Sequence, residues 1–146
     1  MRKATHSLLV TDVDKAAVGS AWSDVNDWRV WDTDLECAKL RGPFHLGAAF
    51  VLRPKGGPNV KIRLERVDVL VGYTDLTRFP LARMYGVHDM EETPDGLRLT
   101  TTIRVEGILG WLWRKLVAQK VADESPTQLL SLVAFARQRT AALTHA

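Results

Sequence analysis

Apolar and polar residues alternate along much of the first 106 positions, which is the pattern of strands that bury one face. In residues 97–106 the odd positions are apolar or threonine and the even positions are polar. Residues 60–65 show the same split, with charged residues at the odd positions. Glycine- and proline-rich turns separate such segments. The predicted strands are residues 5–11, 35–41, 48–53, 60–69, 73–79, 83–92 and 97–106.

Two stretches follow a helical period instead. After the first strand, Asp12 and Asp14 offer side-chain oxygens that cap a helix start, and two short helices are predicted, the second with Trp28 and Trp31 on one side of a turn. The second stretch is a long C-terminal helix over 108–143, interrupted at Ser125-Pro126. Ser125 could cap a new helix, or Pro126 could kink a single one. We favour a kink or a brief break between nearly coaxial pieces.

A sheet with one dry face must bury that face against another element. Only the C-terminal helix is long enough to cover it. Residues 129–136 are apolar except Ser131, which predicts burial over a broad arc of that helix. The chain has 146 residues, the size of one domain, and contains neither an internal repeat nor a linker. We therefore predict a single α+β domain over residues 1–146.

The net charge of +3 does not indicate a nucleic-acid binder. Residues 1–106 carry equal numbers of acidic and basic side chains, so the surplus lies in 107–146, where it is dispersed. Cys37 is the only cysteine, which excludes an intrachain disulfide and fits a reducing cytoplasm. No apolar run is long enough to span a bilayer and the start does not resemble a signal peptide, so no stable membrane insertion is expected.

The sequence contains none of the common catalytic or cofactor motifs. There is no nucleophile elbow, Walker loop or dinucleotide-binding glycine pattern. The four histidines His6, His45, His88 and His145 are scattered, without a pair at metal-ligand spacing. We expect neither a metal nor a cofactor.

Several short motifs resemble those of a known family. They are Asp24 with Trp28 and Trp31-Asp32, then Gly42-Pro43-Phe44 with Gly47 and Phe50, and finally Val105-Glu106-Gly107 ahead of the last helix. Together they resemble the START-related SRPBCC superfamily, in its polyketide cyclase/dehydrase-like branch. The resemblance implies the helix-grip fold, in which a curved antiparallel sheet of about seven strands wraps around a long C-terminal helix, with two short helices after the first strand. It also implies a deep cavity between sheet and helix.

The inward faces of the predicted elements supply candidate ligand contacts. Met84, Gly86 and His88 share one face of strand 83–92, where flexible methionines and a glycine suit a cavity wall. We predict ligand contact for nine residues: Trp28, Trp31, Phe50, Leu64, Met84, His88, Thr101, Leu130 and Ala134. His88 lies on the face of strand 83–92 that is predicted to point away from water. It is the candidate group to orient or activate the ligand, and the tentative catalytic residue. Thr101 and either Arg78 or Tyr73 are the other polar candidates.

These residues leave three functions open. The first is a carrier that binds a small hydrophobic molecule, such as a lipid, an aromatic or a polyketide-like compound, in the cavity. The second is an enzyme of the polyketide cyclase/dehydrase kind, which needs a proton acceptor there. The third is a chaperone-partner or regulatory domain. Homodimerisation also stays open.

Overall fold

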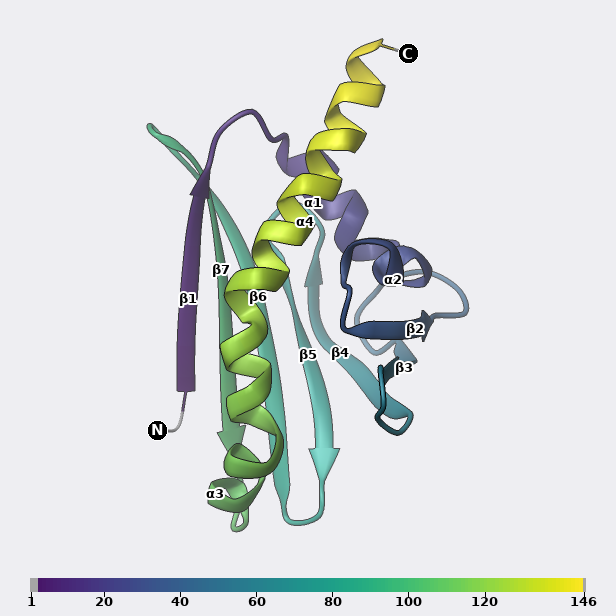
Figure 1. The fold of residues 1–146 in the computed structure, drawn as a ribbon, viewed down its shortest axis with the longest axis vertical. Coiled ribbons are helices and arrows are strands. Elements are labelled where there is room, and N and C mark those ends of the chain that lie inside the picture. The colour runs from purple at the N-terminus through teal and green to yellow at the C-terminus, as the bar shows by residue number, and fades with distance from the viewer. Residues whose placement is uncertain (1–2, 146) are drawn as a thin grey trace.

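The computed structural model describes residues 3–145 and shows seven strands and a long C-terminal helix (Figure 1). The strands are β1 Lys3–Val10, β2 Leu35–Lys39, β3 Ala49–Pro54, β4 Val60–Asp68, β5 Gly72–Phe79, β6 Ala82–Thr93 and β7 Gly96–Glu106. The α-helices are α1 Lys15–Ser23, α2 Trp28–Trp31, α3 Gly110–Trp113 and α4 Gln119–His145. A 3-10 turn, Val25–Asp27, precedes α2, and a π-helix, Arg114–Ala118, joins α3 to α4.

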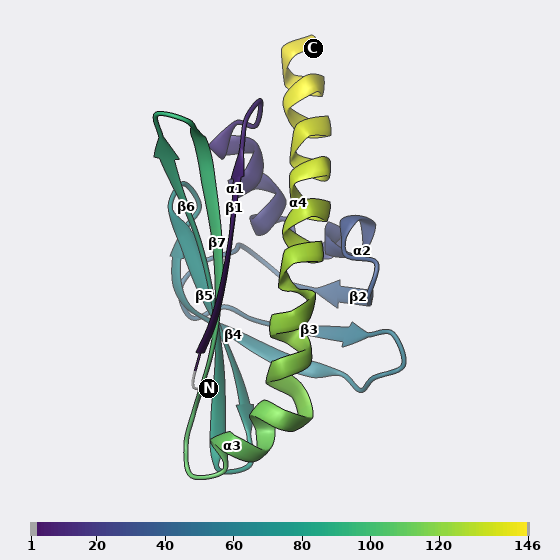
Figure 2. The same cartoon turned by 60° about the vertical axis from the view of Figure 1, so that its left-hand side comes forward.

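All seven strands form one antiparallel sheet in the order β1-β7-β6-β5-β4-β3-β2. The first strand of the chain therefore pairs with the last, from Lys3 opposite Arg104 to Val10 opposite Leu97, and β1 and β2 form the two edges of the sheet. Figure 2 shows α4 lying along one face of this sheet, with β2 and β3 turned around it at the far edge. The predicted helix-grip fold of class α+β, with two short helices after the first strand, is confirmed.

Local sequence explains how the first elements meet. The Asp14 side chain accepts a hydrogen bond of 2.9 Å from the Ala16 N–H, which caps the start of α1 as expected. Inside α1, Gly19 faces the turn between β4 and β5, where a Cβ atom would lie 2.1 Å from the Val69 carbonyl oxygen. Only glycine allows α1 to approach the sheet this closely.

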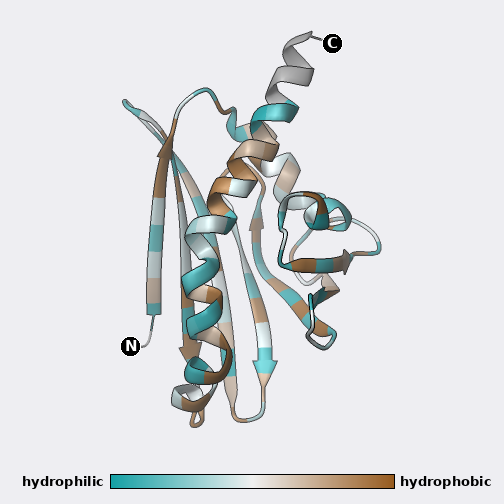
Figure 3. Cartoon of the chain, in the orientation of Figure 1, coloured by the Kyte–Doolittle hydropathy of each residue, from teal (hydrophilic) through white to brown (hydrophobic). Residues whose placement is uncertain are grey.

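The buried face of α4 follows a strict helical period. Leu129, Leu132, Val133 and Ala136 are buried, and Figure 3 shows the apolar stretch of α4 that contains them beside α1. They pack in the larger of two apolar clusters, with α1, α2 and strand residues such as Leu64 and Leu99. The smaller cluster contains Met84, Ile103, Ala118 and Ala122.

The alternative of a brief break at Pro126 is excluded, because α4 is a single helix through the proline. The helix α4 runs without interruption from Gln119 to His145, and Pro126 lies inside it. The irregular segment comes earlier, in the π-helix Arg114–Ala118. A proline removes only its own N–H from the hydrogen-bond ladder, so packing of the following turns against the sheet can hold the helix together around it.

Candidate functional site

A cavity of about 920 Å³ lies between the concave face of the sheet and α4. Side chains from the π-helix and α4 line it at a spacing of three and four residues: Val117 from the π-helix, then Val121, Glu124, Gln128 and Ser131 from α4. This stripe lies beside the buried apolar stripe of the same helix. Helix α4 thus lines the cavity with Val121, with polar groups and with Leu129 and Leu132 of the neighbouring buried stripe.

Five of the nine predicted contacts lie on the cavity wall. They are Trp28, Trp31, Met84, His88 and Thr101, and the weighed candidates Tyr73 and Arg78 line it as well. Tyr73 is buried, whereas Arg78 is exposed. Phe50 and Leu64 are buried but do not line the cavity, since they pack inside the larger apolar cluster.

The placement of Leu130 and Ala134 in the cavity is wrong. Leu130 is 59% exposed, and Ala134 is also on the exposed face of α4. Residues 129–136 are so uniformly apolar that their hydropathy does not say which arc faces the sheet. Because Leu129, Leu132, Val133 and Ala136 face inward, positions 130 and 134 must face away.

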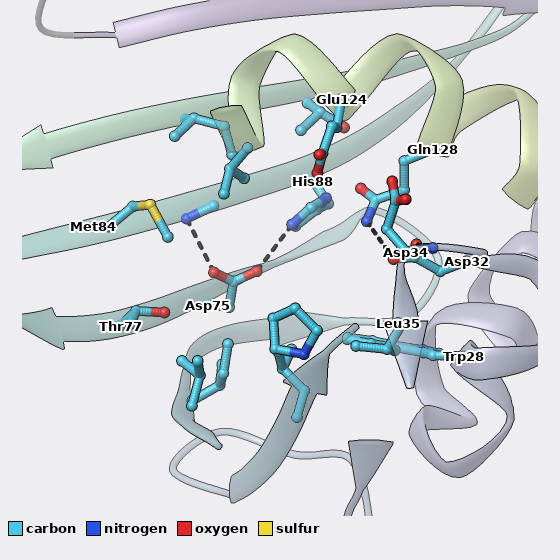
Figure 4. Close-up of a pocket in the computed structure, with 18 of the residues that line it drawn as sticks. Trp28, Asp32, Asp34, Leu35, Asp75, Thr77, Met84, His88, Glu124 and Gln128 are labelled. Carbon is cyan, nitrogen blue, oxygen red and sulfur yellow. Dashed lines mark hydrogen bonds and ion pairs between the residues drawn. The ribbon is translucent and has the colours of Figure 1, made fainter. Parts of the chain in front are cut away.

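The polar centre of the cavity is a hydrogen-bonded pair formed by His88 and Asp75. Nε2 of His88 lies 2.9 Å from Oδ2 of Asp75, and the two side chains are only 14% and 17% exposed (Figure 4). The other carboxylate oxygen, Oδ1, accepts the backbone N–H of Gly86 at 3.2 Å. With Nε2–H donated to the carboxylate, Nδ1 of a neutral imidazole is the remaining acceptor.

The backbone register explains this geometry. Asp75 is the partner of Gly86, and His88 is two residues further along β6 on the same face. A Cβ atom on residue 86 would come within 2.7 Å of both Asp75 carboxylate oxygens. Gly86 therefore provides the space in which the Asp75 carboxylate reaches His88.

Tyr73 stacks on His88, with ring centroids 4.4 Å apart and planes inclined by 18°. It also makes edge contacts with Trp22 and Phe44. Burial raises the pKa of Tyr73, and the negative charges of Asp75 and Asp32 raise it further. The phenol is thus neutral and holds the imidazole ring in place.

A second group of polar side chains lies where α4 meets α2. Gln128 Nε2 donates to Oδ2 of Asp32 at 3.0 Å, with Asp34 and Glu124 on the same part of the wall (Figure 4). Partial burial raises the pKa of Glu124, and the nearby charge of Asp34 adds to this while Lys120 opposes it. Among residues 3–145, no cluster of three His, Cys, Asp or Glu side chains has the arrangement of a metal site.

Two further wall residues are buried donors without a hydrogen-bond partner in the described part of the chain. They are Nε1 of Trp31 and Oγ1 of Thr77. A buried polar group without a partner costs about 1–3 kcal/mol, which a bound molecule with an acceptor would recover.

Sequence reasoning found His88 but missed its partner. Asp75 shares the inward face of β5 with Tyr73 and Thr77, so an acidic residue at a predicted inward position was the available signal. Asp32, Asp34, Glu124 and Gln128 were missed because they meet only when α2 and α4 are placed side by side.

The fold and this cavity define a helix-grip domain, and solved structures with the same fold are known. No family model and no curated protein matches the chain. The hypothetical protein jhp0584 from Helicobacter pylori has a TM-score of 0.74 at 14% identity, over 92% of this chain and 87% of that one. Ara h 8.0201 has a TM-score of 0.69 at 12% identity, over 92% and 97%.

The di-domain ARO/CYC StfQ from the steffimycin biosynthetic pathway has a TM-score of 0.75 at 12% identity. The match covers 96% of this chain and 52% of StfQ. At these identities the likeness shows the fold alone, which is the one that the resemblance to the SRPBCC superfamily implied.

Proposed function

We propose that this protein binds a small, largely apolar molecule in the cavity between the sheet and α4. The observation that carries the proposal is a space of about 920 Å³ walled by Trp28, Trp31 and Met84, with the His88–Asp75 pair inside it. Ligand pockets typically measure about 300–1,000 Å³ and combine apolar walls with a few polar groups. The bound molecule is expected to carry a hydroxyl or carbonyl group that meets His88, Trp31 or Thr77.

A matched pair of α4 variants tests whether the cavity takes up such a molecule. Ser131 lines the cavity, whereas Ala134, three residues later, is exposed. In Ser131→Trp the indole fills part of the cavity, so the affinity for the neutral dye Nile red should fall about tenfold or more, as expected when apolar contacts worth at least 1.4 kcal/mol are lost. Ala134→Trp should bind the dye as the wild type does. Equal dye binding by all three proteins would contradict the proposal.

The His88–Asp75 pair favours a second candidate function, a proton-transferring enzyme of the cyclase/dehydrase kind. A carboxylate bonded to one imidazole nitrogen fixes the tautomer and leaves the other nitrogen as an acceptor, which is the arrangement of a general base. The neighbour StfQ is named as an ARO/CYC protein. That name concerns StfQ, and it supports this second candidate only through the shared fold.

One variant separates the carrier from the enzyme. Native mass spectrometry of protein purified from its own host would first identify the retained molecule. His88→Gln keeps hydrogen-bonding capacity but does not exchange protons near neutral pH. A carrier should then retain most of its affinity, while an enzyme should lose turnover by about a hundredfold or more.

Other expectations stay predictions. They are the single domain over 1–146, the cytoplasmic location, the absence of nucleic-acid binding and the open question of a homodimer. Within the described chain, the structure contains no helix with the length and apolarity to cross a bilayer.

A further inference from the structure

Four large apolar side chains are exposed at the end of the molecule that carries α3 and the β5–β6 turn (Figures 1 and 2). They are Leu81 at 62% exposed, Ile108 at 79%, Trp111 at 55% and Leu116 at 61%. We call this group the apolar end. Such a concentration of exposed apolar residues is uncommon on a protein surface that only meets water.

Hydrogen bonds hold the segments of the apolar end next to one another. The Leu109 N–H donates to the Leu81 carbonyl at 3.0 Å, which joins the β5–β6 turn to the loop before α3. The Trp113 indole donates to the Pro80 carbonyl at 2.9 Å and stacks on Phe79, with centroids 4.6 Å apart. The β5–β6 turn, the loop before α3 and α3 itself therefore lie next to one another at this end, although they come from separate parts of the sequence.

Leu81 has a left-handed backbone, with φ of +57°. This conformation is unfavourable for a residue with a bulky side chain, and glycine or asparagine would relieve the strain. The turn instead exposes a leucine side chain. The strained backbone position is therefore occupied by Leu81, whose apolar side chain is exposed.

The same end is strongly basic. Residues 78–83 and 104–120 contain Arg78, Arg83, Arg104, Arg114, Lys115 and Lys120 but only one acidic residue, Glu106, which forms ion pairs with Arg83 and Arg104. Because the whole chain has a net charge of only +3, the remainder is slightly acidic. Nζ of Lys115 lies over the Trp111 ring, 5.8 Å from its centroid, so a positive charge lies beside this exposed apolar side chain.

We propose that the apolar end docks onto the surface of an anionic lipid bilayer. Tryptophan and aliphatic side chains enter the interface between head groups and acyl chains, while Lys and Arg side chains are attracted to the phosphates of an anionic surface. Lipid offers this combination of negative charge over hydrocarbon across a wide area. Docking of this kind needs no membrane-spanning helix.

Docking would also bring the cavity to the bilayer. Phe79, Trp113 and Val117 line the cavity at this end. A ligand could then pass between membrane and cavity with little exposure to water. This consequence rests on the proposed function, whereas the docking itself does not.

The test is co-sedimentation of the full chain with vesicles. One set contains phosphatidylcholine only, and the other contains phosphatidylcholine and phosphatidylglycerol in equal parts. We expect binding to the anionic vesicles, at least tenfold weaker binding to the neutral ones, and loss of the difference at high salt. Because no dye or cavity ligand is involved, failure of the proposed function would leave this result unchanged.

Variants locate the surface. Trp111→Ser and Ile108→Ser remove apolar area, and Lys115→Glu reverses a charge, so each should weaken binding to anionic vesicles by about tenfold. Leu130→Ser and Lys55→Glu change an exposed leucine and an exposed lysine outside the apolar end and should bind as the wild type does. Circular dichroism melting curves check that every variant is folded.

Three results would overturn the proposal. The first is no vesicle binding, or equal binding to neutral and anionic vesicles. The second is weakening by Leu130→Ser and Lys55→Glu as large as that by the variants of the apolar end. The third is a dimer of the wild type that Trp111→Ser abolishes while vesicle binding stays absent, which would assign the surface to a second copy of the chain.

Discussion

At the residue scale, the polar centre of the cavity depends on three neighbours with different roles. Asp75 bonds to His88, Tyr73 stacks on the imidazole, and Gly86 leaves the space in which the carboxylate lies. The tyrosine is buried between this pair and an aromatic group formed by Trp22, Trp28 and Phe44. Ionised Tyr73 would place a second negative charge beside Asp75, so the arrangement is stable only while the phenol is protonated.

Tyr73 should therefore make stability depend on alkaline pH. Its pKa in the folded state is raised, by burial first and by Asp75 second, above the ordinary value of 10.0. Above pH 10 the unfolded chain loses this proton while the folded chain keeps it, so the free energy of unfolding should fall as pH rises. The slope from this group reaches about 1.4 kcal/mol per pH unit and ends once the pH passes the folded pKa.

Urea denaturation between neutral pH and pH 11 measures this effect. Tyr73→Phe keeps the ring but has no proton to lose, and should show a shallower fall above pH 10. Tyr85→Phe serves as the matched control, because Tyr85 is only half-buried and lies beside Arg104. If Tyr73→Phe and the wild type lose stability in parallel, the phenol does not control the alkaline transition.

The sequence predicted His88 and offered Asp75 as an acidic residue on an inward face, but it could not predict that the two side chains meet. Alternation places His88 on the same face as Met84, and this side of β6 does line the cavity. The His88–Asp75 contact depends on the register between β5 and β6, in which Asp75 pairs with Gly86. A shift of one residue would turn Asp75 to the other face, and no single-strand pattern fixes that register.

At the element scale, α4 presents one stripe to the core and a neighbouring stripe to the cavity. The core stripe contains Leu129, Leu132 and Val133, of which the two leucines also reach the cavity, and the cavity stripe contains Val121, Glu124 and Gln128. The sequence predicted the existence, position and burial of this helix. The sequence could not show which side of residues 129–136 faces the sheet, because leucine, valine, alanine and phenylalanine occupy nearly every position of that stretch.

Pro126 is the second feature of α4 that the sequence left open. The proline is exposed and lies inside an unbroken helix, so the Ala122 carbonyl lacks its usual N–H donor. The Ser125 hydroxyl donates to the neighbouring Val121 carbonyl at 3.1 Å, which adds a side-chain hydrogen bond next to the missing backbone one. The helix continues because its packing outweighs the local cost of the proline.

Pro126→Ala should consequently stabilise the protein. Alanine restores the missing backbone hydrogen bond and removes the clash of the ring, which together should raise the free energy of unfolding by about 1–3 kcal/mol. Urea denaturation at neutral pH measures the change. Gln138→Ala, on the exposed face of the same helix, should stay within about 0.5 kcal/mol of the wild type. A less stable Pro126→Ala would mean that the packing of α4 requires the proline.

At the scale of the whole molecule, the cavity lies beside both apolar clusters and draws side chains from each. Trp28 and Leu132 of the larger cluster line it, and so do Met84 and Ile103 of the smaller one. The larger cluster joins α1, α2 and α4 to the sheet. The smaller one contains only four buried residues and lies against the π-helix Arg114–Ala118. The end that we propose to dock on lipid therefore packs against fewer buried apolar residues than the end that contains α1 and α2.

This asymmetry predicts that the π-helix end opens more easily than the rest of α4. Amides in residues 112–118 should exchange with deuterium at least about tenfold faster than those in 129–136, because local opening there exposes less apolar surface. Hydrogen exchange followed by mass spectrometry measures both segments in one experiment. Val117 and Trp113 line the cavity. Binding of Nile red there should therefore slow exchange in 112–118 more than in 129–136. Equal exchange in the two segments would contradict this prediction. It would show that the π-helix and α4 open together, whatever the size of the cluster behind each.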